Sequence, residues 1–146
     1  MLHLFHPAFV HFGVAFIATG ALLEAWGLFR DHEPSRRYGA PLLGAGTLVL
    51  IAVVASGYLA ANTIVLQDAA RETLKVHERN GWILLAALVL LHFWKSWSGE
   101  RLPRFQEKLY ALALVGVVGW MAWSAYLGGR LVYTFGTGVS PGGIAP

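Results

Sequence analysis

Four long apolar stretches, separated by short segments that carry most of the charges, dominate the pattern of the chain. They cover residues 8–29, 41–62, 79–97 and 109–128. Each approaches the roughly 20 residues that a helix needs to cross a bilayer, and backbone inside lipid must satisfy its own hydrogen bonds. Because the connections are short, neighbouring helices should be antiparallel. The pattern predicts a single all-α transmembrane domain, an up-down-up-down four-helix bundle.

Local signals predict where these helices begin and end. Pro7 suits the first position of the first helix, so His6 should precede that helix. The charged segment 68–79 is amphipathic and should extend the third helix out of the membrane. After Gly128 and Gly129 the chain is rich in glycine. We expect the fourth helix to end there and the tail to lie over the bundle as a cap or loose strand.

The composition agrees with a membrane protein and narrows its chemistry. Hydrophobic residues make up 56% of the 146 residues and charged residues 13%, whereas about a quarter of a soluble domain is charged. The absence of cysteine excludes disulfides, iron–sulfur clusters, thiolate zinc sites and covalently attached c-type haem. The net charge of +3 is small, so we expect no nucleic-acid partner.

The distribution of lysine and arginine predicts the orientation. Seven lie in the loops after the first and third spans and four on the opposite side, and positive residues favour the cytoplasm. We therefore expect a multi-pass protein of the bacterial inner membrane with both termini in the periplasm. The seven are Arg30, Arg36, Arg37, Lys95, Arg101, Arg104 and Lys108, and the four are Arg71, Lys75, Arg79 and Arg130.

Two histidines on the predicted outer side suggest a cofactor. His11 lies one turn inside the first helix, and His77 lies near the start of the third. The first and third helices are diagonal partners in such a bundle, so these side chains should face each other at equal depth. Two imidazoles in this arrangement are typical of non-covalent haem b. We expect one haem b, with His11 and His77 as the iron ligands, in a protein that transfers electrons.

Other residues near the same face would complete such a site. Gly57 and Gly81 would let a flat ligand approach the backbone. Arg79 and Arg130 would reach the haem propionates. Glycine is also common wherever membrane helices pack closely, and histidines near a membrane surface also serve as anchors, so these readings stay open.

The first helix offers a second choice of ligand. Gly13, Gly20 and Gly27 recur every seven residues and look like a packing seam. By the helical period of about 100° per residue, His11 points roughly 140–200° away from that seam. His6 lies nearer its direction and is the reserve ligand.

The inner end of the bundle contains one histidine and one carboxylate within the spans. His92 lies 15 residues after His77, a spacing that would suit a second haem. The corresponding position on the first helix is Trp26, so we expect His92 to be a buried histidine bonded to a neighbour and only a reserve metal ligand. Glu24 could extend toward the cytoplasmic surface or pair with His92, and we expect the first. Val10–Phe12 resembles Leu91–Phe93, a match too short to define a repeat.

Two alternatives use the same residues differently. His3, His6, His11 and His77 would also suit a copper or zinc site facing the periplasm, since imidazole binds both metals. The chain would otherwise be a non-catalytic subunit of a larger redox complex. Candidate partners are the lipid bilayer, a periplasmic cytochrome or membrane redox subunit, a quinone, and a second copy of the chain.

Three segments resemble a known family. They are HPAFVHFG at residues 6–13, the His77-to-Gly81 spacing before the third span, and GGRLVYTFGTGV at residues 128–139. The chain is similar here to the small bacterial four-helix membrane proteins catalogued as domain of unknown function two-two-three-one. The family often has proline where this chain has Gly13. The resemblance implies the four-helix fold, and it implies no assigned reaction. A haem role has been suspected there because the histidines matching His6, His11 and His77 lie at one membrane face.

Overall fold

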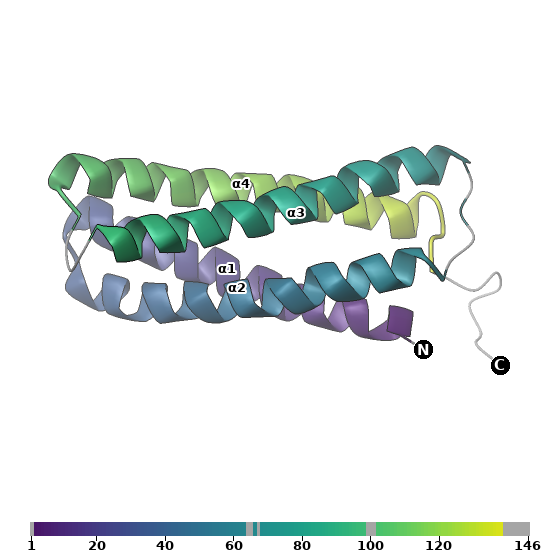
Figure 1. Ribbon diagram of the computed structural model, residues 1–146, viewed down its shortest axis with the longest axis horizontal. Helices are drawn as coiled ribbons and strands as arrows, with labels where there is room; N and C mark the ends of the chain where they lie inside the picture. The colour runs from purple at the N-terminus through teal and green to yellow at the C-terminus, as the bar shows by residue number, and fades with distance from the viewer. Residues whose placement is uncertain (1, 64–65, 67, 99–101, 139–146) are drawn as a thin grey trace.

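Four antiparallel helices form the bundle (Figure 1). The computed structural model describes residues 2–63, 66, 68–98 and 102–138, with side chains from His6 onward. The helices are α1 (Leu2–Arg30), α2 (Glu33–Ala61), α3 (Asp68–Trp97) and α4 (Arg104–Tyr133). α1 and α3 each pack on both α2 and α4, whereas in the described part of the chain their own backbones stay apart. The predicted all-α bundle, with α1 and α3 as diagonal partners, is therefore confirmed.

Two helix ends differ from the sequence prediction. α1 begins at Leu2, so Pro7 lies inside the helix and His6 is part of it. Proline near a helix start removes only one backbone hydrogen bond, which the remaining turns tolerate. α4 continues through Gly128 and Gly129 to Tyr133, since no proline stops it. Residues 134–138 then fold back over the bundle end as the expected cap, and residues 139–146 lie outside the described part of the chain.

Two ion pairs connect the hairpin α1–α2 to the hairpin α3–α4. Lys95 pairs with Glu24, and the Arg36 guanidinium lies 3.5 Å from the Glu107 carboxylate. Both pairs join positions 71 apart, from 24 to 95 and from 36 to 107. Each of these four residues therefore contacts the residue at the equivalent position of the other hairpin. This is the pattern that a parallel internal repeat with an approximate two-fold relationship produces. The resemblance of Val10–Phe12 to Leu91–Phe93 is out of this register.

The two hairpins differ in how closely their helices approach. α1 and α2 form the most extensive interface of the bundle, with backbones that nearly touch. A Cβ atom at Gly39 would lie 2.5 Å from the Glu24 nitrogen, and one at Gly46 would lie 2.8 Å from the Ile17 nitrogen. In the register of the repeat, positions 20, 39 and 46 correspond to larger residues, which keep α3 and α4 further apart. These are Leu91, Tyr110 and Val117.

Three helices are long and apolar enough to cross a membrane: α1 from His6, α2 and α4. α3 falls below the same threshold because its first three turns are charged and because His92 and Lys95 interrupt its apolar part. Its outward surface is nevertheless rich in large apolar side chains, as on the other helices. Those exposed on α3 are Trp82, Ile83, Val89, Leu90, Phe93 and Trp97. Such a surface suits lipid rather than water.

Candidate functional site

A cavity of about 340 Å³ lies between the helices at the end where α1 and α3 begin. All four helices contribute to its wall, and Thr137 and Gly138 cover it from the bundle end. The wall is mostly apolar, with a few polar groups among which are His6, His77 and Glu78. Apolar cavities with a few convergent polar groups are the usual form of small-molecule and cofactor sites.

His6 reaches the cavity from α1 and is held by α2. Its Nδ1 lies 3.1 Å from the Val53 carbonyl oxygen and 3.1 Å from the Ser56 hydroxyl. The ring lies against Gly57, where a Cβ atom would be 2.8 Å from the imidazole Cε1. Real Cβ atoms do not approach other atoms this closely, so only glycine leaves room for the His6 ring here.

His77 is held by α4 in the same way. Its Nδ1 lies 2.9 Å from the Ser124 carbonyl oxygen. The ring lies against Gly128, where a Cβ atom would be 3.2 Å from Cε1. In both hairpins the histidine bonds to a carbonyl 47 residues later, and glycine follows that carbonyl after one helical turn. His6 and His77 are themselves 71 positions apart, the same spacing that separates the two residues of each ion pair.

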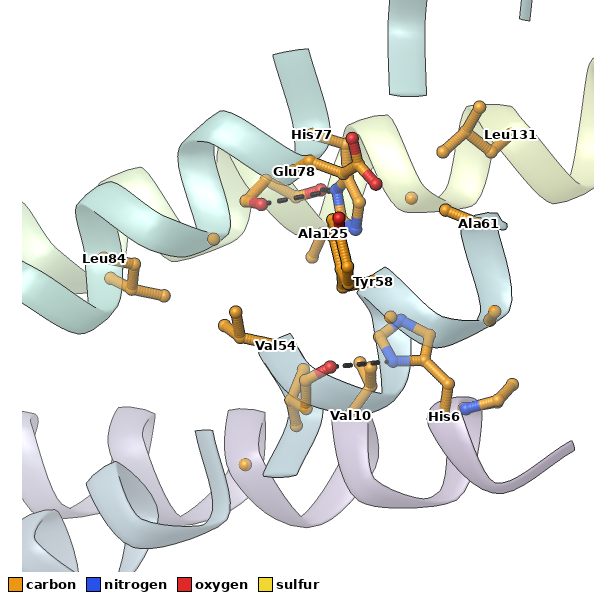
Figure 2. Close-up of a pocket in the computed structure, with 18 of the residues that line it drawn as sticks. His6, Val10, Val54, Tyr58, Ala61, His77, Glu78, Leu84, Ala125 and Leu131 are labelled. Carbon is orange, nitrogen blue, oxygen red and sulfur yellow. Dashed lines mark hydrogen bonds between the residues drawn. The ribbon is translucent and has the colours of Figure 1, made fainter. Parts of the chain in front are cut away.

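These hydrogen bonds determine which imidazole nitrogen is free. A carbonyl oxygen only accepts, so each Nδ1 carries the hydrogen and donates it. The other nitrogen, Nε2, then has an available lone pair. Figure 2 shows the two rings on opposite sides of the cavity, with the nitrogen that makes no hydrogen bond directed toward the space between them. Metal-binding histidines commonly donate their second nitrogen to a backbone carbonyl in this manner.

His11 lies outside this arrangement. It is exposed, and its Nδ1 donates to the Pro7 carbonyl oxygen at 2.6 Å within α1. It lies five positions after His6 on the same helix, which turns the two side chains about 140° apart. The structure thus brings His77 together with His6, the reserve ligand of the sequence prediction, and does not bring it together with His11.

Of the other predicted site residues, the two glycines line the cavity and the two arginines do not. Gly57 and Gly81 line the cavity; the room that Gly57 provides is taken by the His6 ring. Arg79 is exposed and Arg130 lies 5.6 Å from the Phe135 ring centre, and neither contributes to the cavity wall.

Sequence reasoning missed the acceptors that hold the two rings. They are backbone carbonyls of Val53 and Ser124, which no residue-type motif reveals. The only local signal was a glycine four residues after each carbonyl, at Gly57 and Gly128. Glu78 also lines the cavity and was not among the predicted site residues.

The inner end of the bundle forms a separate polar region. His92 Nε2 lies 3.0 Å from the Thr47 hydroxyl, which itself donates to the Leu43 carbonyl, so the histidine bonds to a neighbour as expected. Glu24 is 1% exposed and pairs with Lys95. The expectation that it extends to the cytoplasmic surface is wrong, because the close approach of α2 at Gly39 covers it.

Within the part of the chain whose side chains are described, no three histidine, aspartate or glutamate side chains gather as a metal site would require. The side chain of His3 lies outside that part. Structural zinc sites use four protein ligands and catalytic ones three. The His6–His77 pair alone matches haem iron better, because the porphyrin supplies the other four nitrogens.

Comparison with known proteins supports the fold. A family described as "predicted membrane protein (DUF2231)" matches residues 2–141. No curated protein and no solved structure matches the chain. Since the family match covers nearly the whole sequence, the chain belongs to this family of predicted membrane proteins.

Proposed function

We propose that this protein is a b-type membrane cytochrome that holds one haem between α1 and α3 and exchanges electrons with a partner. His6 and His77 would hold the haem iron in this proposal, and His6 takes the role that sequence reasoning had given to His11. The apolar part of α3 crosses the membrane with the other three helices.

The arrangement of the two imidazoles carries the proposal. They come from diagonal helices, at corresponding positions of the repeat, and both present Nε2 to one apolar cavity. An iron centred between two equivalent ligands is the natural occupant of such a site. With His6 and His77 both holding its iron, a haem here would supply electron transfer.

The cavity around the two histidines also suits a haem group. The cavity volume of about 340 Å³ lies within the usual range of ligand cavities, roughly 300–1,000 Å³. Its wall is mostly apolar, as the macrocycle requires, and Gly57 and Gly128 let both rings recede into the walls. The lysine and arginine distribution supports a position of the site near the periplasmic face. A periplasmic cytochrome or a membrane redox subunit is therefore the partner that we propose.

The test is a reduced-minus-oxidised spectrum of protein purified in detergent after expression with ample haem. We expect a sharp b-type α band and about one haem per chain. His6→Ala and His77→Ala should each remove most of the band. His11→Ala is the matched control, because His11 lies on the same helix five residues away and faces outward; this variant should keep the full band.

The alternatives give different results in the same experiment. Copper or zinc without iron in elemental analysis would favour the metal site, with His3 as an additional ligand. Neither haem nor metal, together with co-purifying redox proteins, would favour a scaffold subunit. A band that survives His77→Ala would remove the proposed site.

A further inference from the structure

We infer that haem enters this cavity sideways from the lipid, through the contact between α2 and α3. The inference rests on the proposed function, and it adds the source of the ligand and the part of the fold that must open. It follows from three features of the cavity: the covering of its end, the packing of its sides, and the side chains at its margin.

At the bundle end, the segment after α4 covers part of the cavity. Thr137 and Gly138 lie over it and form part of its wall. Three backbone hydrogen bonds hold this segment on the end of α4: Phe135 to Arg130 at 3.2 Å, Gly136 to Val132 at 3.0 Å and Thr137 to Leu131 at 2.9 Å. Uptake from water along the bundle axis would have to pass this held segment.

The side formed by α2 and α3 is the weakest part of the wall. These helices share the smallest of the four interfaces, and in Figure 1 they diverge toward the end that holds the cavity. A Cβ atom at Gly81 of α3 would meet only Val54 of α2, at 3.7 Å, which is ordinary van der Waals contact. The corresponding pair on the opposite side, in the register of the repeat, is Val10 and Ala125, at the more extensive interface of α1 with α4.

The cavity reaches the outer surface at this contact. Tyr58 of α2 and Trp82 of α3 both line it, although they are 57% and 55% exposed. Large aromatic side chains at the margin of an apolar cavity offer a flat surface to a planar ligand. On the membrane-facing side of a bundle, the medium at this margin is lipid, so the ligand admitted here is one already dissolved in the bilayer.

A disulfide across this contact tests the route. The chain contains no cysteine, so Val54→Cys/Gly81→Cys can form only one disulfide within a chain. A Cβ atom at position 81 would lie 3.7 Å from the Val54 Cγ2, where the sulfur of a cysteine at position 54 can lie. The apoprotein is placed in phosphatidylcholine vesicles, oxidised or reduced, and haemin is supplied from a second set of vesicles. We expect the oxidised protein to gain its α band at least ten times more slowly, with the rate restored by reduction. Equal rates would overturn the inference.

The reverse order separates a closed route from a filled cavity. When the reduced variant is loaded first and then oxidised, the band should persist, and loss of haem to apomyoglobin should slow at least tenfold. Expulsion of haem on oxidation would mean that the disulfide only occupies the site, and would also overturn the inference. The single variants Val54→Cys and Gly81→Cys report any effect of the side chains themselves. If the reduced protein shows no band that depends on His77, the proposed function itself has failed.

Discussion

Gly57 and His6 are in such close contact that a Cβ atom at position 57 would lie 2.8 Å from Cε1 of the imidazole. The ring is fixed between this backbone and the Val53 carbonyl, which accepts its Nδ1 hydrogen. The same relationship joins Gly128 to His77 with a larger distance, 3.2 Å. In both cases a missing side chain on one helix determines the position of a histidine on another.

Alanine at these glycines should therefore displace the histidines. Gly57→Ala forces the His6 ring away from Val53, and we expect at least a fivefold loss of bound haem per protein. Gly128→Ala should have a smaller effect, because the ring of His77 needs to shift by only a few tenths of an ångström. Haem content is measured by the pyridine haemochrome spectrum against protein concentration.

The neighbouring glycine provides the control for this prediction. A Cβ atom at Gly129 would meet only Tyr133, at 3.9 Å, so Gly129→Ala should retain full haem content. Alanine also favours a helix over glycine by about 0.5–1 kcal/mol, so a general loss of stability is not expected in any of the three variants. Equal haem content in all three alanine variants would contradict the proposed contact of the His6 and His77 rings with the two glycines.

Replacing one of the two histidines by methionine, which can itself bind iron, should change the colour and the reduction potential rather than abolish haem binding. In His6→Met the thioether reaches the same region of the cavity, and a histidine–methionine pair raises the reduction potential relative to two histidines. We expect the midpoint potential to rise by roughly 100 mV or more, a shift that falls well within the range set by axial ligands. His11→Met should leave the potential unchanged, and a shift there of similar size would assign the ligand to His11 instead.

The ion pair at the inner end should matter for stability and not for the spectrum. In Lys95→Met, Glu24 is left buried without its partner, and we expect the free energy of unfolding to fall by about 2–4 kcal/mol. We place the loss below that of a fully buried pair because the Lys95 side chain is 40% exposed. The double variant Glu24→Gln/Lys95→Met should regain part of it, since the uncompensated charge is gone.

Thermal unfolding in detergent, followed by circular dichroism, measures these differences. The α band of each variant that folds should match that of the unmodified protein, because the pair lies at the opposite end of the bundle from His6 and His77. A Lys95→Met protein as stable as the original would contradict the role assigned to the pair.

The close packing of α1 on α2 gives a separate prediction. Gly39→Ala places a methyl group 2.5 Å from the Glu24 nitrogen, and such overpacking costs about 1–3 kcal/mol. At Gly44, on the same helix, a Cβ atom meets nothing within 4 Å, so Gly44→Ala should be neutral or slightly stabilising. Midpoint temperatures of the two variants, measured side by side, check the difference.

The sequence predicted the helices well and the site less completely. Apolar runs of membrane-spanning length define the four helices, because lipid permits little else. The choice between His6 and His11 depended on whether α1 begins before or after Pro7, and proline rules favoured the later start. The carbonyls of Val53 and Ser124 belong to the backbone, so no side-chain pattern could identify them.

The internal repeat was also beyond reach from residue identity. At the paired positions the two hairpins have opposite charges, Glu24 with Lys95 and Arg36 with Glu107, so the correspondence is one of location. A comparison of residue types along the sequence therefore misses the repeat, whereas the contacts across the bundle reveal it. The same residue is retained in both halves at only a minority of positions, among them His6 and His77, Gly57 and Gly128, and Leu43 and Leu114.

Glycines let α1 approach α2 closely, whereas α3 and α4 have larger residues at the matching positions. The hairpin α1–α2 should therefore be the stiffer half of the bundle and the hairpin α3–α4 the more deformable half. Deformation under thermal motion should therefore concentrate in the second half, with the first acting as a fixed frame. His77 belongs to the more deformable hairpin α3–α4, and His6 belongs to the stiffer hairpin α1–α2. A ligand bound between them would be accommodated by a displacement of α3 alone, while α1 keeps its place.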